Sequence, residues 1–398
     1  LLLSPLTKIL INRAIQMKTK LLMVVNVDWF FMSHRLPIAL AALEKGYEVH
    51  LAFRFTGEQE NLKNLGFVIH EIPFSRARVS LIQEIKICFT ILRLLIRLRP
   101  DVIHAVTIKP SLYVGILARV LGIKKLVIAV SGLGLVFVAK GRFALWRKWL
   151  IEFLYKIAVN PKHTRLIFQN ETDAATLQVI VRADLRNINL IKGSGVDLAE
   201  YKYTEQPVTE KMVVSLAARL LREKGIYEFI RAAEIISQSD FSDSISMRLI
   251  GVPDLENPNS ILPEEWETWK KSGIVDCLGF RSDISTLFSQ TNIVVLPSYY
   301  GEGLPKVLIE AAACGRAIIT TDCPGCRDSI LDGETGIIIP AKDPIALSNA
   351  ILKFAKNKRL VRNMGMAARK YAEKTFSVDS VVSLHLGIYE SILRSGDC

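Results

Sequence analysis

The chain reads IVVLPSYYGEGLPKVLIEAAACGRAIITT over residues 293–321, and this stretch decides the fold. The apolar run 293–297 predicts a buried strand, and a turn flanked by glycines follows it. Pro305 suits the first turn of a helix, because the amide hydrogen that proline lacks would be unpaired there. A second apolar run, 317–321, predicts another strand after that helix. Continuously apolar strands joined by a helix indicate a parallel sheet that is covered on both faces.

The same alternation of strands and helices extends in both directions from this stretch. A first series of strands is predicted at 21–27, 48–53, 67–72, 101–106, 126–130, 165–169 and 188–191, and a second at 212–217, 246–251, 274–279, 293–297, 317–321 and 336–340. Between the series, the polar stretch 201–210 predicts a linker. We therefore expect an α/β protein with two Rossmann-like, doubly wound domains that face an interdomain cleft.

The 398 residues are enough for two such domains. We expect an N-terminal domain at 17–201 and a C-terminal domain at 204–373. A last helix in 374–398 would cross back to the first domain. Met17 is the first methionine and a strand pattern follows it, so residues 1–16 are interpreted as an upstream extension.

The composition is globular and basic. Hydrophobic residues make up 50% and charged residues 23%, which excludes wholesale disorder. The net charge of +12, from 51 Lys and Arg against 39 Asp and Glu, favours polyanionic partners such as nucleic acid, anionic lipid or phosphorylated small molecules. Nucleic acid is disfavoured, because the charge is diffuse and no recognised binding module is present.

The six cysteines are scattered, with no secretory leader, and this usage indicates a reducing, cytosolic compartment. Cys323 and Cys326 form a Cys-x-x-Cys pair. A structural zinc site would need a second pair, so ordinary packing in a Pro-Gly turn is favoured over a redox role. The longest nearly uncharged apolar run, 126–139, is shorter than the roughly twenty residues that a membrane span needs.

Two pairs of charged residues follow predicted strands of the second series. Glu302 lies in the turn after 293–297, and Glu310 follows about two helical turns later. One carboxylate would hold a sugar and the other a ribose diol, and both could equally be solvated helix-end carboxylates. Arg219 and Lys224 follow the strand 212–217 and could clamp a diphosphate, or form a solvated basic turn. Equivalent positions on neighbouring strands favour the functional interpretation of both pairs.

These two pairs resemble the motifs of retaining family 4 glycosyltransferases with the GT-B fold. Glu302 and Glu310 match the family's Glu-x7-Glu motif, and Arg219 and Lys224 match its Arg-x4-Lys pair. The resemblance runs from about residue 18 to 393. It implies that Arg219 and Lys224 bind the donor diphosphate, that Glu310 binds the ribose, and that Glu302 faces the transferred sugar.

The same resemblance implies further donor contacts. Gly303 and Leu304, beside Glu302, would bind the donor, and the loop of Gly279, Phe280 and Arg281 would cover the nucleobase. The segments 29–35, 131–134 and 322–327 look like those of the branch that extends undecaprenyl-diphosphate-linked oligosaccharides, which includes N-acetylgalactosaminyltransferases and O-antigen and capsule enzymes.

The chain departs from this family pattern at two positions. Pro305 replaces a common glycine, which removes one backbone donor. Many relatives carry a histidine after the strand here predicted at 126–130, where this chain has Ser131 and Gly132. Candidates for the vacant sugar or acceptor contact are His34, Arg35, His104, Ser131 and Gly132. For the two histidines the alternative is a packed, hydrogen-bonded side chain, which is the commoner role of a lone histidine.

A basic, aromatic segment at 140–157 predicts contact with an anionic membrane. One helical face would carry Phe143, Trp146, Leu150, Phe153, Leu154 and Ile157, with Arg147, Lys148, Trp149 and Lys156 around its edges. An ordinary helix packed on the first sheet is the alternative. The basic, apolar stretch 81–99 precedes a strand and is interpreted mainly as a core crossover helix.

The resemblance thus implies transfer of a hexose or N-acetylhexosamine, with retention, from a nucleotide diphosphate sugar to a lipid-linked sugar. The N-terminal domain would bind the acceptor, and the C-terminal domain would bind the nucleotide sugar. UDP is favoured over GDP, and the enzyme would act at the cytoplasmic face of the inner membrane. No cofactor or metal is expected, because the chain contains no Asp-x-Asp. The alternatives are a nucleotide-sugar epimerase and a non-catalytic nucleotide-sugar-binding subunit. A dinucleotide dehydrogenase is excluded, since no Gly-x-Gly-x-x-Gly follows the first strand.

Overall fold

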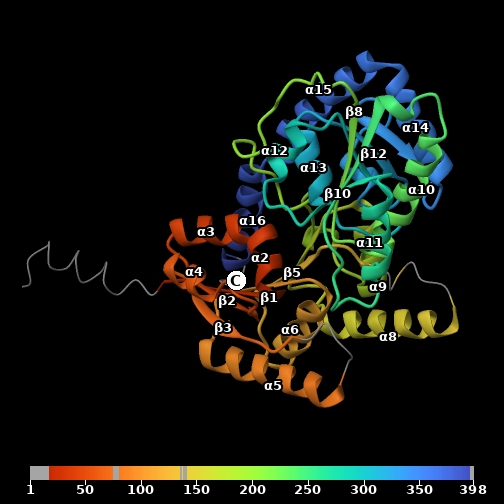
Figure 1. Cartoon of the computed structure of the whole chain (residues 1–398). Helices are drawn as coiled ribbons and strands as arrows, with labels where there is room; N and C mark the ends of the chain where they lie inside the picture. Colours follow the sequence, from red (N-terminus) through yellow and green to blue (C-terminus); the bar gives the residue numbers. More distant parts are fainter. Residues whose placement is uncertain (1–17, 75–79, 135–136, 138–140, 395–398) are drawn as a thin grey trace, which may run out of the picture.

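The computed structural model describes residues 18–74, 80–134, 137 and 141–394, and it shows two α/β domains, each built on a parallel sheet (Figure 1). The expected extension at 1–16 lies outside the described residues. Every strand expected from the apolar runs is present, with boundaries that differ by two residues at most.

The first sheet has seven strands in the order β3-β2-β1-β4-β5-β6-β7, all paired in parallel. They are β1 (Lys20–Val27), β2 (Glu48–Arg54), β3 (Val68–Glu71), β4 (Val102–Val106), β5 (Leu126–Val130), β6 (Thr164–Phe168) and β7 (Ile188–Leu190). One face packs against α5 (Leu81–Leu98), α6 (Ile108–Val120), α8 (Arg142–Ala158) and α9 (Glu171–Val181). The other face packs against α2 (Asp28–His34), α3 (Leu36–Glu44), α4 (Gln59–Asn64) and α16 (Val378–Arg394).

The second sheet has six parallel strands in the order β10-β9-β8-β11-β12-β13. They are β8 (Met212–Ala217), β9 (Ile245–Ile250), β10 (Asp276–Gly279), β11 (Ile293–Leu296), β12 (Ala317–Thr321) and β13 (Gly336–Ile339). Helices α10 (Ile226–Ser237), α11 (Pro263–Ser272), α14 (Pro344–Lys356) and the start of α15 (Lys358–Thr375) share one core. Helices α12 (Ile284–Ser289), α13 (Lys306–Ala313) and the end of α15 share the other.

The strand order reverses at one point in each sheet, between β1 and β4 in the first and between β8 and β11 in the second. Connections leave these neighbouring strands in opposite directions, so ligands bind beyond their carboxyl ends. The carboxyl edges of the two sheets meet: the Gly134 amide, after β5, donates to the Gly301 carbonyl, after β11, at 3.2 Å. We call this region the junction.

One helix boundary differs from the expectation. Helix α13 begins at Lys306, and Pro305 is its N-cap residue, with φ −63° and ψ 119°. Proline therefore lies just before the first turn, in an extended conformation, rather than inside it.

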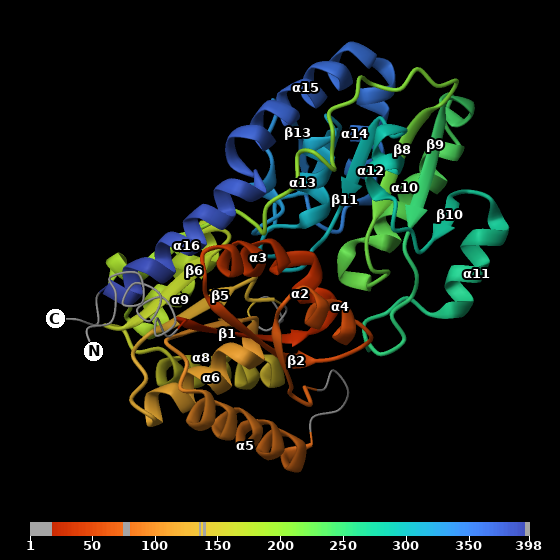
Figure 2. The ribbon, with the colours of Figure 1, turned by 90° about the vertical axis from the view of Figure 1, so that its left-hand side faces the viewer.

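The chain passes between the domains a second time near its end. The Val196 amide donates to the Phe376 carbonyl at 2.8 Å, and the Val378 amide donates to the Val196 carbonyl at 3.1 Å, so the two crossings are tied together. Beyond them α16 lies along α3 of the first domain (Figure 2).

Candidate active site at the junction

Arg219 and Lys224 follow β8 at the point of strand reversal. The Arg219 guanidinium lies 3.2 Å from Asp254 Oδ2 and 5.6 Å from the ring centre of Trp29, which belongs to the first domain. Lys224 ends a short 3-10 turn, and Gly225 after it has φ 77° and lies so close to β11 that a Cβ there would overlap the Pro297 carbonyl. Only glycine fits both the positive φ and this close approach.

This close approach brings Lys224 to the turn after β11. Lys224 Nζ lies 2.5 Å from Glu302 Oε1, and the Ser298 hydroxyl donates to the same oxygen at 3.1 Å. Both charged side chains are mostly shielded from solvent, at 17% and 12% exposure. The two motifs singled out in the sequence therefore meet, as their equivalent places on neighbouring strands predicted.

Glu310 lies on α13 and is buried. Its carboxylate is 3.5 Å from Lys306 Nζ and is hydrogen-bonded to Tyr201. Burial raises the pKa of Glu310, while Lys306 and Tyr201 act in the opposite direction. Lys306 also donates to the Ser33 carbonyl of the first domain at 2.9 Å, so the start of α13 is fixed from both domains.

Gly303 and Leu304 follow Glu302 directly against the first domain. The Leu304 amide donates to Gln169 Oε1 at 2.9 Å, and a Cβ on Gly132 would lie 2.6 Å from the Gly303 amide nitrogen. Gly132 has φ 103° and Ser131 precedes it, so both reach the junction. Gln169 was not predicted as a site residue, because the sequence pattern placed it at the end of an expected strand, 165–169.

His34 ends α2 at the junction. Its ring stacks on Phe30 with centres 4.2 Å apart. Burial, and then the charges of Arg35, Lys306 and Lys224, lower the pKa of His34 to about 3. His34 is therefore neutral at physiological pH.

Two of the other candidates for a sugar or acceptor contact are corrected by the structure. His104 is fully buried, and its Nδ1 lies 2.6 Å from the hydroxyl of Tyr389 on α16, in the core rather than at the junction. Arg35 is also buried. It donates to the His34 carbonyl at 2.9 Å and to the Ser131 hydroxyl at 3.2 Å, so it supports residues of the junction from beneath.

The loop that was expected to cover the nucleobase, residues 279–281, lies at the carboxyl edge of the second sheet. Gly279 has φ 68°, and its carbonyl accepts a hydrogen bond from the Gly251 amide at 2.8 Å. The Phe280 side chain is 77% exposed, and Arg281 pairs with Asp283 at 2.5 Å. An exposed aromatic ring at this edge offers a stacking surface for a base.

Two models of known protein families match the sequence of this chain. A model described as "Glycosyl transferase 4-like" matches residues 20–170, and a model described as "Glycosyl transferases group 1" matches residues 200–371. The first match lies within the N-terminal domain, and the second covers almost all of the C-terminal domain. The chain is a GT-B glycosyltransferase.

The glycosyltransferase has relatives that match along most of its length. It is 28% identical over 385 residues to the N,N'-diacetylbacillosaminyl-diphospho-undecaprenol alpha-1,3-N-acetylgalactosaminyltransferase of Campylobacter jejuni, covering 92% of this chain and 99% of that one. It is 25% identical to the UDP-Gal:alpha-D-GlcNAc-diphosphoundecaprenol alpha-1,3-galactosyltransferase of Escherichia coli, covering 73% and 75%. The crystal structure of Anabaena HepE with UDP has a TM-score of 0.72 at 17% identity, covering 94% and 100%, and this likeness shows the fold.

The cysteines of the glycosyltransferase are unpaired over the described ranges. Cys326 is buried, and burial raises its pKa to about 12; the pKa of Cys323 is raised as well. Such thiols remain protonated and unreactive. Within the same ranges, no group of three His, Cys, Asp or Glu side chains is placed to hold a metal ion, and no helix is both long and apolar enough to cross a bilayer.

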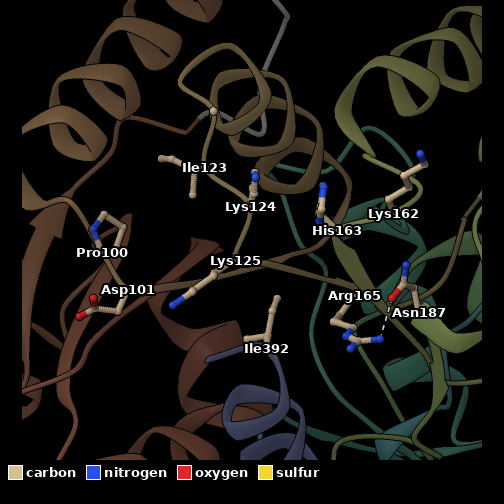
Figure 3. Close-up of a pocket in the computed structure, with 11 residues that line it drawn as sticks. Pro100, Asp101, Ile123, Lys124, Lys125, Lys162, His163, Arg165, Asn187 and Ile392 are labelled. Atoms are coloured by element: carbon tan, nitrogen blue, oxygen red, sulfur yellow. Dashed lines mark hydrogen bonds between the residues drawn. The ribbon is translucent and has the colours of Figure 1, made fainter. Parts of the chain in front are cut away.

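Two prominent cavities of the glycosyltransferase lie away from the junction, at the amino ends of the strands. One of about 580 Å³ borders β4, β5 and β6 (Figure 3). Basic residues surround it: Lys124, Lys125, Lys162, His163 and Arg165. The other, about 650 Å³, borders β8, β9 and β10. Ligands of open parallel sheets bind at the carboxyl ends instead, so the junction remains the candidate active site.

Proposed function

We propose that this glycosyltransferase moves a hexose or N-acetylhexosamine, with retention, from a nucleotide diphosphate sugar to a lipid-diphosphate-linked sugar in bacterial surface glycan synthesis. The observation that carries the proposal is the meeting of Lys224 and Glu302 at the strand reversal of the second sheet. The names of the Campylobacter and Escherichia relatives support the lipid-diphosphate acceptor, and the latter supports UDP.

Each residue of the site has a proposed role. Arg219 and Lys224 stabilise the negative charge that grows on the departing diphosphate, which is the main electrostatic demand of the reaction. Glu302 contacts the transferred sugar, and Glu310 binds the ribose hydroxyls. Phe280 stacks on the base. We assign no protein general base; the departing phosphate receives the proton of the acceptor hydroxyl.

We also propose that the enzyme docks on the anionic cytoplasmic face of the inner membrane. Tyr155 and Ala158 of α8 are buried in the first domain, while an exposed stripe runs along the helix: Leu145, Trp146, Trp149, Phe153 and Ile157. Lys140 and the side chain of Phe143 lie outside the described residues. Exposed Arg142, Arg147 and Lys156 accompany the stripe.

Helix α5 packs on the first sheet before β4, as expected of a crossover helix, but its outer face is exposed and we include it in this surface. Only Ile87, Ile91 and Leu95 are buried, because a helix on a sheet turns a single stripe inward. Its outer face exposes Leu81, Ile82, Ile85, Phe89 and Ile96. Helix α6 contacts both α5 and α8, so the two lie in one layer below the first sheet in Figure 1. Two exposed apolar helices with basic flanks suit an anionic interface.

The function is tested with a panel of nucleotide sugars and a short-chain lipid-diphosphate-N-acetylhexosamine acceptor, with products identified by mass spectrometry. We expect one donor to give an acceptor extended by one sugar. An incubation without acceptor separates transfer from epimerisation, because an epimerase converts the donor alone. Donor conversion without acceptor, or no product with any donor, would contradict the proposal.

A further inference from the structure

The first domain holds the backbone of the Glu302 turn through two adjacent side chains. Gln169 and Asn170 follow β6, and both are buried, at 5% and 1% exposure. Gln169 Oε1 accepts from the Leu304 amide at 2.9 Å. Asn170 Nδ2 donates to the Glu302 carbonyl at 3.2 Å and to the Gly303 carbonyl at 3.0 Å. Two adjacent side chains of the first domain thus form hydrogen bonds with the backbone of three consecutive residues of the second domain.

The backbone of the turn is closely packed at two glycines. A Cβ on Gly303 would overlap Gln169 Oε1, and one on Gly325 would overlap the Gly303 carbonyl. The turn is therefore confined between β6 of the first domain and the loop after β12. A buried carbonyl that lost its donor here would remain unpaired, which is costly.

The orientation of the Asn170 amide is fixed as well. Its Oδ1 accepts from the Asp173 amide at 2.8 Å as the cap of α9, so its Nδ2 must face the two carbonyls. Asp173 Oδ2 accepts from Asn170 Nδ2 at 2.9 Å and from the Leu133 amide at 3.3 Å. The same network therefore connects the Glu302 turn to the segment after β5, on the acceptor side.

We infer that Gln169 and Asn170 are positioning residues, which place the Glu302 carboxylate for transfer only when the first domain is docked on the turn. This inference rests on the proposed function. Asn170 acts on Glu302 through the backbone carbonyl of that residue. Arg219 and Lys224, which are proposed to bind the diphosphate, lie in the second domain and do not depend on this contact. Loss of the pair lowers turnover much more than it weakens nucleotide binding.

The test uses Asn170→Asp, which keeps the oxygen that caps α9 and replaces the donating NH2 by an acceptor. Misplacement of a catalytic group by about 1 Å can cost roughly 100-fold in rate, so we expect a kcat loss of about that size. Inhibition by UDP should change by less than about threefold. Gln169→Ala should act in the same direction, and Gln169→Glu, which keeps an acceptor oxygen, should recover much of that loss.

A matched control is Asn187→Asp. Asn187 is also buried in the first domain, and its side chain bonds only Arg165 and Pro161 among the described residues. This variant should keep wild-type kinetics. In a Glu302→Gln background, Asn170→Asp should cost less than about threefold, because the two changes act on one step.

Two readouts decide the inference. The inference is wrong if Asn170→Asp and Gln169→Ala both turn over at the wild-type rate. It is also wrong if Asn170→Asp lowers kcat as much in the Glu302→Gln background as in the wild type. X-ray scattering gives an answer without activity: Asn170→Asp should raise the radius of gyration above that of Asn187→Asp, and equal values would also overturn it. If the wild type transfers no sugar, the proposed function fails. The scattering comparison then tests by itself whether Asn170 holds the first domain against the Glu302 turn.

Discussion

Lys224 Nζ and Glu302 Oε1 are 2.5 Å apart, and both side chains are mostly shielded from solvent, so the two opposite charges neutralise each other. The Ser298 hydroxyl supports the same carboxylate oxygen at 3.1 Å. Removing one partner of a buried ion pair leaves the other charge uncompensated. The roles of these residues therefore have to be separated by comparing variants rather than from one variant alone.

Lys224→Ala is expected to lower kcat by two to three orders of magnitude, about 3–4 kcal/mol, and to weaken donor binding less. The reason is that the negative charge on the leaving phosphate grows in the transition state, so the lost attraction matters most there. Steady-state kinetics after circular dichroism confirms folding would measure this. Turnover within a few-fold of wild type would show that Lys224 does not contact the diphosphate.

Glu310→Gln and Glu302→Gln are expected to differ in their inhibition by UDP. A ribose contact is remote from the reacting centre, so Glu310→Gln should raise the donor KM and weaken UDP inhibition. Glu302→Gln should slow transfer and leave UDP inhibition nearly intact, because the proposed ligand of Glu302 is the transferred sugar rather than the nucleotide. If both variants weaken UDP inhibition equally, the two assignments are wrong.

Asp173 is expected to make stability depend on pH. Burial, with a smaller contribution from Asp328, raises its folded-state pKa from 3.8 to about 6. The folded protein then binds more protons than the unfolded chain between these values, so the contribution of Asp173 to stability is greatest below pH 4. It falls as the pH rises through 6, by about 3 kcal/mol in total.

Asp173→Asn stays uncharged at every pH and lacks this loss. Urea unfolding at pH 4 and pH 7 should show that the unfolding free energy of the variant, relative to wild type, increases by about 3 kcal/mol over this range. The comparison within each pH cancels the other titrating groups. A constant difference would mean that Asp173 titrates normally.

Replacing Arg142, Arg147 and Lys156 of α8 with Gln should weaken binding to anionic liposomes by roughly two orders of magnitude, because each basic residue near such a surface contributes about 1 kcal/mol. Flotation assays would measure it. The matched control replaces Lys353, Lys358 and Arg359, which are exposed on α14 and α15 of the other domain. Equal losses in both triple variants would indicate a diffuse charge effect and no docking face.

Transfer is expected to persist in EDTA, because in the proposed function Arg219 and Lys224 supply positive charge for the diphosphate, and the chain has no Asp-x-Asp. Rates with EDTA, and with added manganese or magnesium, would measure this. If EDTA abolishes transfer and either metal restores it, a metal ion rather than these two side chains binds the diphosphate.

The central strands could be predicted because they are apolar on both faces and are bounded by turn residues. The edge strands β3, β7 and β10 are less apolar, and β3 and β10 were predicted with less exact boundaries. The meeting of Lys224 with Glu302 followed from strand adjacency. His104 was misplaced because nothing local shows that Tyr389, far along the chain, covers it. Gln169 was missed for a similar reason: its partner, the Leu304 amide, is a backbone group that carries no side-chain signal.

Helix α16 ties the first domain to the end of the described chain. Val381, Leu386, Tyr389 and Ile392 complete one of its two cores, beside Phe31 and Ile38. On the ribosome, the whole second domain must therefore be synthesised before α16 can complete this core, which α2, α3 and α4 cover only in part. The domain that emerges first is thus the last to finish folding, and the side of α3 that α16 contacts stays uncovered until then.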